Sequence, residues 1–103
     1  MRIALHPDAR TELRAAALWY EEQRPGLGDE FVASVSSVLE RITEVPFSFP
    51  GWPELPAGHS PIHRAVTPRF PYLIAFEVHS QHVLVLAIAH AKRRPFYWLT
   101  RTR

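Results

Sequence analysis

Four side chains near the C-terminal end of the sequence have types suited to proton transfer and to binding of anions. They lie in the segment H-A-K-R-R-P-F-Y-W, residues 90–98, and are His90, Arg93, Arg94 and Tyr97. Histidine and tyrosine can donate or accept a proton, and an arginine guanidinium binds a phosphate or a carboxylate through two parallel hydrogen bonds. Metal-independent cleavage of RNA needs such a set: a base, cations beside the phosphate and an acid. The segment is therefore one candidate wall of a site.

Three further candidates lie on a predicted strand and in the turn that follows it. His63 and Arg64 belong to the strand, and Arg69 belongs to the turn. If Arg64 and His90 lie on neighbouring strand ends, they could converge on one phosphate. The candidates for catalysis are then His90, Tyr97 and Arg64. The candidates for binding a substrate or target are Arg69, Arg93, Arg94 and His63.

Each candidate also has a purely structural interpretation. The ring of His90 can simply hydrogen-bond a neighbouring strand end, and Arg64 can form an ion pair with Glu77. The charged run at residues 92–94 can complement a helix or solvate the surface. Tyr97 can serve as a lid on the core instead of a platform on which bases stack. The residue types alone leave both interpretations open.

The composition excludes several kinds of site. The chain has no cysteine, which excludes disulfides, thiolate zinc sites and cysteine nucleophiles. No two of its six histidines have the H-x-x-x-H spacing on a helix, so we expect no bound metal and no other cofactor. The N-terminus lacks the features of a signal peptide, and no run approaches the roughly 18 apolar residues of a membrane span. We therefore expect a cytoplasmic protein without a membrane partner.

Charge is distributed unevenly along the chain. Residues 1–60 contain five Lys and Arg against nine Asp and Glu, whereas residues 61–103 contain seven against one. Such asymmetry suggests an acidic or polyanionic partner for the basic part. A small basic surface that keeps the protein soluble explains the same charge count.

The first half of the chain predicts a strand and two helices. Residues 2–6 alternate as in a strand, and Pro7 begins an amphipathic helix that Pro25 ends. A second helix follows from Gly28, as its N-cap, to Pro46. The short P-G-L-G connection predicts an antiparallel helical hairpin, in which Trp19 and Tyr20 serve as scaffold.

The second half predicts an antiparallel sheet. Residues 62–67, 72–79 and 82–90 have the pattern of strands joined by turns, and the run at 83–89 is apolar on both faces, as in a central strand. The segment 95–101 is predicted as a short helix or an ordered tail. We therefore predict a single α+β domain over residues 1–103, in the order β-α-α-β-β-β, with the hairpin packed on one sheet face. The other face must be covered by the tail, by the proline-rich loop at 47–61 or by a partner.

Three blocks of the sequence resemble one known family. They are W-Y-E-E-Q-R-P-G-L-G-D-E-F at residues 19–31, I-H-R-A-V-T-P-R-F-P-Y-L-I-A-F at 62–76 and V-L-V-L-A-I-A-H-A-K-R-R-P-F-Y-W at 83–98. In this order they are similar to the RelE/ParE superfamily of toxins from type II toxin–antitoxin modules, also called plasmid-stabilisation proteins. His63 stands where a second arginine is frequent in that family.

The resemblance implies a bacterial toxin that inhibits growth and is neutralised by a cognate antitoxin. RelE-like members cleave ribosome-bound mRNA without a metal, and the proton-transfer candidates His90 and Tyr97 fit this activity. ParE-like members inhibit DNA gyrase without catalysis, and the lack of a lysine-rich surface fits them, since Lys92 is the only lysine. A binding module without toxicity is a third reading. In each case we expect an acidic antitoxin segment on the basic sheet face, in a toxin–antitoxin hetero-oligomer.

Overall fold

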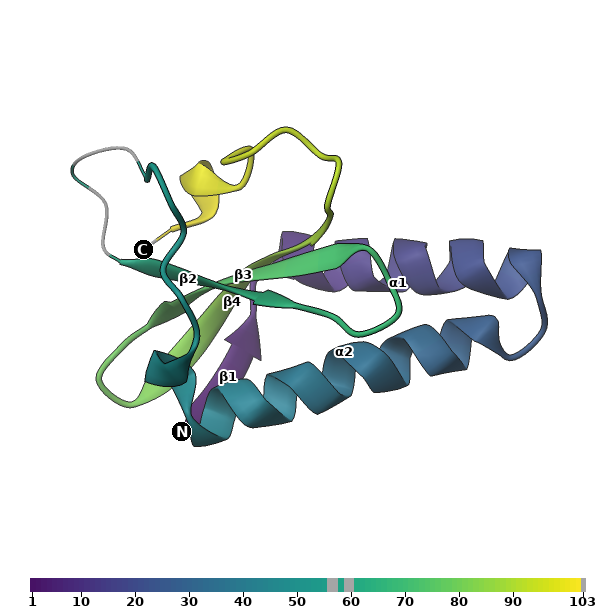
Figure 1. Cartoon of the computed structure of the whole chain (residues 1–103), viewed down its shortest axis with the longest axis horizontal. Coiled ribbons are helices and arrows are strands. Elements are labelled where there is room, and N and C mark those ends of the chain that lie inside the picture. The colour runs from purple at the N-terminus through teal and green to yellow at the C-terminus, as the bar shows by residue number, and fades with distance from the viewer. Residues whose placement is uncertain (56–57, 59–60, 103) are drawn as a thin grey trace.

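The computed structural model describes residues 1–55, 58 and 61–102 (Figure 1). In chain order the elements are β1 (Arg2–Leu5), α1 (Pro7–Gln23), α2 (Leu27–Glu44), the 3-10 turn η1 (Pro46–Ser48), β2 (Ile62–Val66), β3 (Tyr72–Val78), β4 (His82–His90) and the 3-10 turn η2 (Leu99–Arg101). This confirms the predicted α+β order β-α-α-β-β-β, with both helices under one face of the sheet. No helix in the described ranges is long and apolar enough to cross a membrane.

The two helices form the predicted antiparallel hairpin. Pro7 occupies the first turn of α1, where its missing N–H costs nothing, and Asp8 stands near the positive end of the helix dipole. The N-cap of α2 is Gly26, with φ +88°, and not Gly28 as predicted. The capping group is the carboxylate of Glu21 on α1, which accepts the backbone N–H groups of Gly26 at 2.9 Å and Gly28 at 3.0 Å. A side chain from the neighbouring helix thus moves the start of α2 two residues earlier.

The sheet has the strand order β1-β4-β3-β2 and is mixed. Strands β2, β3 and β4 form the predicted antiparallel meander, and β4 is central, as its two apolar faces indicate. Strand β1, whose pairing the sequence did not predict, runs parallel to β4 from Arg2 opposite His82 to Leu5 opposite Val85. Parallel strands need a long connection between them, and the chain from β1 to β4 passes through both helices and the rest of the meander.

A hydrophobic core lies on each face of the sheet. On the helix side, the core is built mainly from Phe31 and Ile42 of α2 and Phe76 of β3. On the other side, Trp98 of the tail is 1% exposed and lies edge-on to Trp52 of the proline-rich loop, with ring centroids 5.0 Å apart. The sequence left open whether the tail, the proline-rich loop or a partner covers this face. In the structure the tail and the loop cover it together (Figure 1).

A β-bulge interrupts β4 and changes the direction of its later side chains. Ala75 of β3 pairs with Ala87, but the next residue, Phe76, pairs with Val85, so Leu86 is an extra residue in β4. An extra residue shifts the alternation of side chains by one position.

The bulge decides on which face His90 lies. Leu84 and Leu86 belong to the tail-side core, whereas Ile88 belongs to the helix-side core. Leu84 and Leu86 therefore do not share a face with Ile88 and His90, as simple alternation along the strand would require. His90 lies on the helix side, directly opposite Tyr72 of β3.

Candidate functional site

A half-buried carboxylate on α1 joins the C-terminal tail to the edge of β4. Glu12, whose side chain is 17% exposed, accepts hydrogen bonds from the Tyr97 hydroxyl at 2.6 Å, from the Arg101 guanidinium at 3.0 Å and from the Ile88 N–H at 3.0 Å. Arg101 also donates to the Leu86 carbonyl at 2.9 Å. We call these five residues the Glu12 clasp. It ties three distant segments of the chain to one point.

The clasp completes the hydrogen bonding of β4 beyond the end of β1. The pairing of β1 stops at Leu5 opposite Val85, so the backbone groups of Leu86 and Ile88 on that edge have no strand beside them. Buried backbone groups without partners are costly; Arg101 supplies the missing donor to the Leu86 carbonyl, and Glu12 supplies the missing acceptor for the Ile88 N–H.

The Glu12 role was missed in the sequence, although a signal for it exists. Glu12 lies three residues after Ala9 and four before Ala16, the two buried alanines of α1. Those spacings place all three on one helix face. An acid on the buried face of an amphipathic helix indicates a paired carboxylate.

Tyr97 is fixed by the clasp and in turn positions a cation. Burial and then the hydrogen bond to Glu12 raise the pKa of Tyr97 far above its ordinary value of 10.0, so the hydroxyl keeps its proton even at alkaline pH. Its ring lies beneath the Arg93 guanidinium, with the guanidinium carbon 4.0 Å from the ring centroid, and Arg101 lies 5.2 Å away. Arg93 is thereby held over the surface next to β4.

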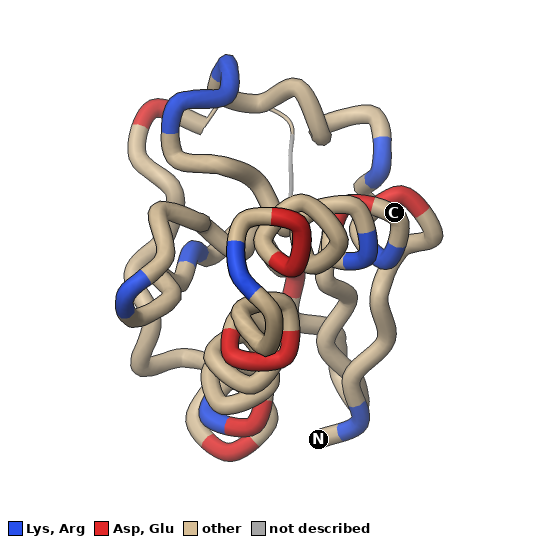
Figure 2. The backbone as a smooth tube through the Cα atoms, turned by 90° about the vertical axis from the view of Figure 1, so that its right-hand side faces the viewer, with Lys and Arg blue, Asp and Glu red and all other residues tan. Residues whose placement is uncertain are grey.

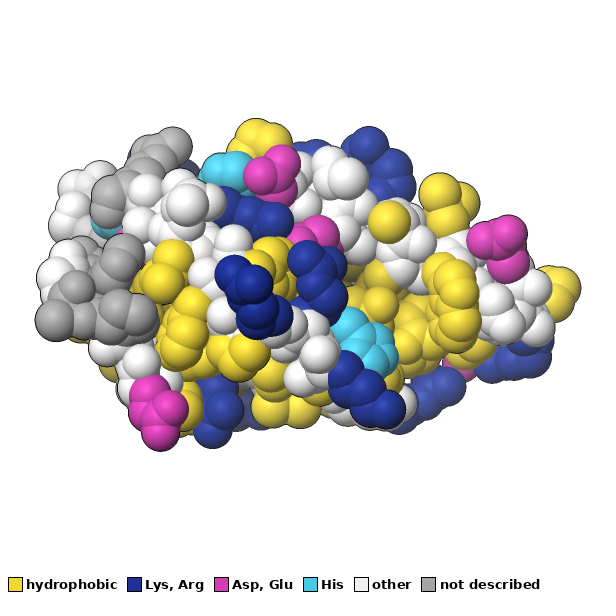
Figure 3. Space-filling view, turned by 90° about the horizontal axis from the view of Figure 1, so that it is seen from above, with side chains coloured by type: hydrophobic (Ala, Val, Ile, Leu, Met, Phe, Trp, Pro, Cys, Tyr) yellow, Lys and Arg dark blue, Asp and Glu magenta, His cyan; other side chains and the backbone are white. Residues whose placement is uncertain are grey.

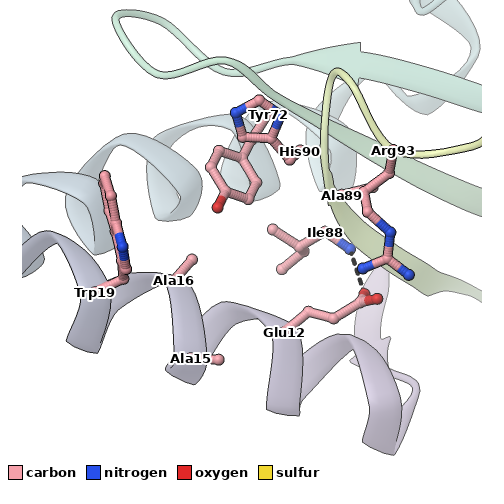
Figure 4. Close-up of a pocket in the computed structure, with 9 residues that line it drawn as sticks. All are labelled: Glu12, Ala15, Ala16, Trp19, Tyr72, Ile88, Ala89, His90 and Arg93. Atoms are coloured by element: carbon pink, nitrogen blue, oxygen red, sulfur yellow. Dashed lines mark hydrogen bonds between the residues drawn. The ribbon is translucent and has the colours of Figure 1, made fainter.

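A groove separates α1 from the end of β4. It has a volume of about 260 Å³, and its lining residues, drawn in Figure 4, are Glu12, Ala15, Ala16, Trp19, Tyr72, Ile88, Ala89, His90 and Arg93. An adjoining hollow of about 440 Å³ shares Trp19, Tyr72 and His90 and continues to Tyr20 and Pro71. We call the two together the α1–β4 groove. Trp19 stands on one wall, opposite Tyr72 and His90 (Figure 4), and Arg93 lies near Glu12 at the other end.

The groove combines apolar walls with a cationic end. Trp19 is 56% exposed although it was predicted to be scaffold, whereas its neighbour Tyr20 packs against Phe31 and Phe70 as predicted. Figure 3 shows hydrophobic, cationic and histidine side chains gathered together on this side of the molecule. Exposed aromatic rings beside an arginine are the residue types that most often anchor protein–protein contacts.

His90 uses one of its ring nitrogens within the fold. Its Nδ1 accepts the backbone N–H of Lys92 at 3.1 Å, and its ring lies edge-on to Tyr72 at 5.3 Å between centroids. In the neutral ring this contact places the proton on Nε2. The half-buried ring therefore presents a hydrogen-bond donor from the wall of the groove.

The structure does not bring Arg64 together with His90. Arg64 lies opposite Ala75 of the tail-side core, whereas His90 lies on the helix side, and β3 separates their two strands. Among the described residues the Arg64 side chain has no ion pair, so the alternative interpretation, an ion pair with Glu77, does not hold there either. The carboxylate of Glu77 lies 3.6 Å from His79 instead.

Two other candidates are engaged in contacts of the fold. Arg69 has a positive φ of 70° in the β2–β3 turn, and its guanidinium pairs with Glu30 of α2 at 2.8 Å. Hydrogen bonds from Arg69 and then from Arg24 lower the pKa of Glu30. His63 contacts the Phe49 carbonyl through Nδ1 at 3.0 Å, and its ring stacks against the helix-side core.

The predicted residues therefore separate into two groups. His90, Arg93, Arg94 and Tyr97 border one hollow beside Trp52 and Trp98, and His90 and Arg93 also line the groove. Arg64, Arg69 and His63 lie elsewhere. Within the described ranges no group of three acidic, histidine or cysteine side chains could hold a metal ion.

Comparison with known proteins identifies the family. The model of the family described as "ParE toxin of type II toxin-antitoxin system, parDE" matches residues 3–95. The solved structure "Chromosomal ParDE TA system from P. aeruginosa" has the same fold, with a TM-score of 0.62 and 17% identity over 87% of this chain and 95% of that chain. No curated protein matches the sequence. Because the family model spans most of the 103 residues, the chain belongs to the ParE toxin family of type II toxin–antitoxin systems.

Proposed function

We propose that this ParE-family toxin acts by binding DNA gyrase through the α1–β4 groove and does not cleave RNA. The observation that carries the proposal is the state of Tyr97. Its hydroxyl donates to Glu12 at 2.6 Å and its pKa is raised, so it is a poor proton acceptor or donor near neutral pH.

The remaining candidates for catalysis do not replace it. Nδ1 of His90 is bound to the backbone N–H of Lys92, which leaves one ring nitrogen for proton transfer. Arg64, the expected phosphate ligand, lies on the opposite sheet face. RNA cleavage needs an acid and a base on either side of one phosphate, together with a cation. The groove offers His90 and Arg93, and also the phenol of Tyr72, whose pKa is raised by burial so that it too is a poor proton donor near neutral pH.

The same residues suit recognition of a protein. Trp19 and Tyr72 offer large rigid apolar surfaces, and Arg93 is already oriented by the ring of Tyr97. Side chains held in place before binding lose little entropy when a partner arrives. The groove could therefore accept an apolar side chain of a target, with an acidic group beside Arg93.

Membership in the family implies a cognate antitoxin. We propose that an acidic antitoxin segment occupies the same groove in a toxin–antitoxin hetero-oligomer and places carboxylates beside Arg93 and Arg94. The antitoxin would then neutralise the toxin by covering the surface that the target needs.

The test compares two activities of the purified chain. Supercoiling by gyrase and translation of a defined mRNA are measured side by side, and the mRNA ends are mapped after translation. We expect inhibition of supercoiling and intact mRNA. Trp19→Ala and Arg93→Glu should abolish the inhibition, whereas Arg10→Glu, an exposed reversal on α1 outside the groove, should preserve it.

Two outcomes would overturn the proposal. Cleavage of ribosome-bound mRNA with unaffected supercoiling would restore the nuclease prediction, and His90→Ala should then abolish cleavage. Absence of both activities, in protein that still binds its antitoxin, would indicate a binding module without toxicity.

A further inference from the structure

The outward face of α1 carries an exposed leucine between two opposite charges. Leu18 is 62% exposed, and its position lies roughly opposite the buried Ala9 and Ala16 on the helical wheel. Arg14 and Glu22 stand one turn before it and one turn after it, and both are exposed. We call these three residues the α1 ridge. The ridge lies outside the α1–β4 groove.

The two charged side chains of the ridge make no polar contact within the described part of the fold. Arg14 and Glu22 have no ion pair or side-chain hydrogen bond with any described residue. They are eight residues apart, which is about 12 Å along a helix, so they cannot pair with each other. Leu18 is not isolated, since Ala17 and Val32 border the hollow beside it, so these two charges flank a small contiguous apolar surface.

The order of the three residues makes the ridge complementary to itself. If a second copy packs its α1 antiparallel to the first, a two-fold axis passes through Leu18. Arg14 of each copy then faces Glu22 of the other, and both ion pairs form at once. A parallel arrangement would place like charges together. We propose that the α1 ridge is a self-association surface on which two copies of this chain form a symmetric dimer.

The surroundings of the ridge favour this contact. Beside it a shallow hollow of about 270 Å³ between α1 and α2 is bordered by the apolar Ala17 and Val32, and Val32 is 37% exposed. The second copy can cover these apolar groups together with Leu18. Two crossed helices bury less than the roughly 1,200–2,000 Å² of stable complexes, so the dimer should form only at high protein concentration.

Sedimentation equilibrium of the full chain over a wide concentration range tests the proposal. We expect a monomer–dimer equilibrium that weakens as salt is added. Leu18→Glu should leave only monomer, and Arg14→Glu or Glu22→Arg should raise the dissociation constant by about tenfold or more, because each reversal creates two repulsive pairs. The double variant Arg14→Glu/Glu22→Arg restores opposite charges across the axis and should recover dimerisation.

Glu40→Arg, an exposed reversal on α2 away from the ridge, should dimerise as the parent does, and circular dichroism checks that each variant is folded. A parent chain that stays monomeric at millimolar concentration would overturn the proposal. A double variant as weak as the single ones would also overturn it. Loss of antitoxin binding in Leu18→Glu, with a parent that does not dimerise, would assign the ridge to another protein.

Discussion

At the scale of single residues, the carboxylate of Glu12 accepts hydrogen bonds from two separate segments. They come from Ile88 in β4 and from Tyr97 and Arg101 in the tail. A carboxylate with so little contact with water is stable only if its oxygens are paired, and both oxygens of Glu12 are. Removing its charge would leave the Arg101 guanidinium, 13% exposed, without its main partner.

We predict that Glu12→Gln destabilises the fold by about 2 kcal/mol. The amide keeps an acceptor for Tyr97 or Ile88 but loses the ion pair with Arg101, and charge-assisted hydrogen bonds in partly buried sites have about this value. Urea unfolding gives the free energy of unfolding. The matched control is Glu40→Gln, an exposed acid on α2 that should change stability by less than about 0.5 kcal/mol. Equal values for the two variants would contradict the prediction.

The raised pKa of Tyr97 makes stability depend on pH in the alkaline range. The folded chain keeps the phenol proton, whereas the unfolded chain begins to lose it near the ordinary pKa of 10.0. The contribution of Tyr97 is therefore fully present below pH 10 and is lost as the pH rises further.

In Tyr97→Phe this alkaline loss should be smaller, because the ring remains and the titrating group is gone. The variant should also lose about 1 kcal/mol at neutral pH with its hydrogen bond to Glu12. Urea unfolding between pH 8 and 11 measures both effects. Tyr20→Phe leaves the clasp intact and should keep most of the alkaline loss. An unchanged pH dependence in Tyr97→Phe would show that the hydroxyl is not held as described.

At the scale of elements, hydrophobic periodicity predicted the helices and the meander but not the bulge. In each helix the apolar residues recur every three or four positions and form one stripe, so both helices lie where they were expected. The run V-L-V-L-A-I-A at 83–89 is apolar at every position. Such a run gives no sign of which residues face which side, so the extra Leu86 and the resulting direction of His90 could not be predicted.

The candidate site could be predicted only where its residues are close in sequence. His90, Arg93 and Tyr97 fall within one short segment, and the structure keeps them together. Glu12 and Trp19 reach the same groove from α1 through tertiary packing, which a single sequence does not reveal. The fold and the family could thus be predicted from the sequence, whereas the set of residues that line the groove could not.

The helical hairpin depends on a close approach at Gly28. A Cβ atom at this position would lie 2.6 Å from the Ala17 carbonyl oxygen and 3.0 Å from the Glu21 carboxylate. We predict that Gly28→Ala destabilises the fold by about 2 kcal/mol, because the backbone of α1 must move. Gly51→Ala is the matched control, since its nearest atom lies 3.9 Å away, and it should stay within about 0.5 kcal/mol of the parent in urea unfolding. A loss at Gly51 as large as at Gly28 would refute the argument.

At the scale of the whole molecule, folding neutralises part of the charge asymmetry of the sequence. Acidic residues concentrate on the two helices (Figure 2). Across the fold, Glu30 pairs with Arg69 and Glu12 pairs with Arg101. Arg93 lies over the ring of Tyr97 and pairs with no acid among the described residues. The basic half of the chain therefore presents a local cationic surface at the groove, and a binding partner has to match that surface.

Two tryptophans lie in opposite environments, one in a core and the other on the proposed contact surface. Trp98 is 1% exposed in the tail-side core, whereas Trp19 is 56% exposed on the wall of the α1–β4 groove. We predict that Trp98→Ala costs about 4 kcal/mol, a large part of the stability of a domain this small, because it removes the centre of that core. Trp19→Ala should cost less than about 1 kcal/mol and still abolish inhibition of supercoiling.

Urea unfolding and the gyrase assay on the same preparations give both results. Each tryptophan variant is thereby the control for the other: the same side chain is removed, and only its place in the fold differs. If Trp19→Ala inhibits gyrase as well as the parent does, the groove is not the contact surface. In that case the exposed aromatic wall beside Arg93 would bind another partner. The next candidate would be the antitoxin, whose binding can be measured by titration with the same two variants.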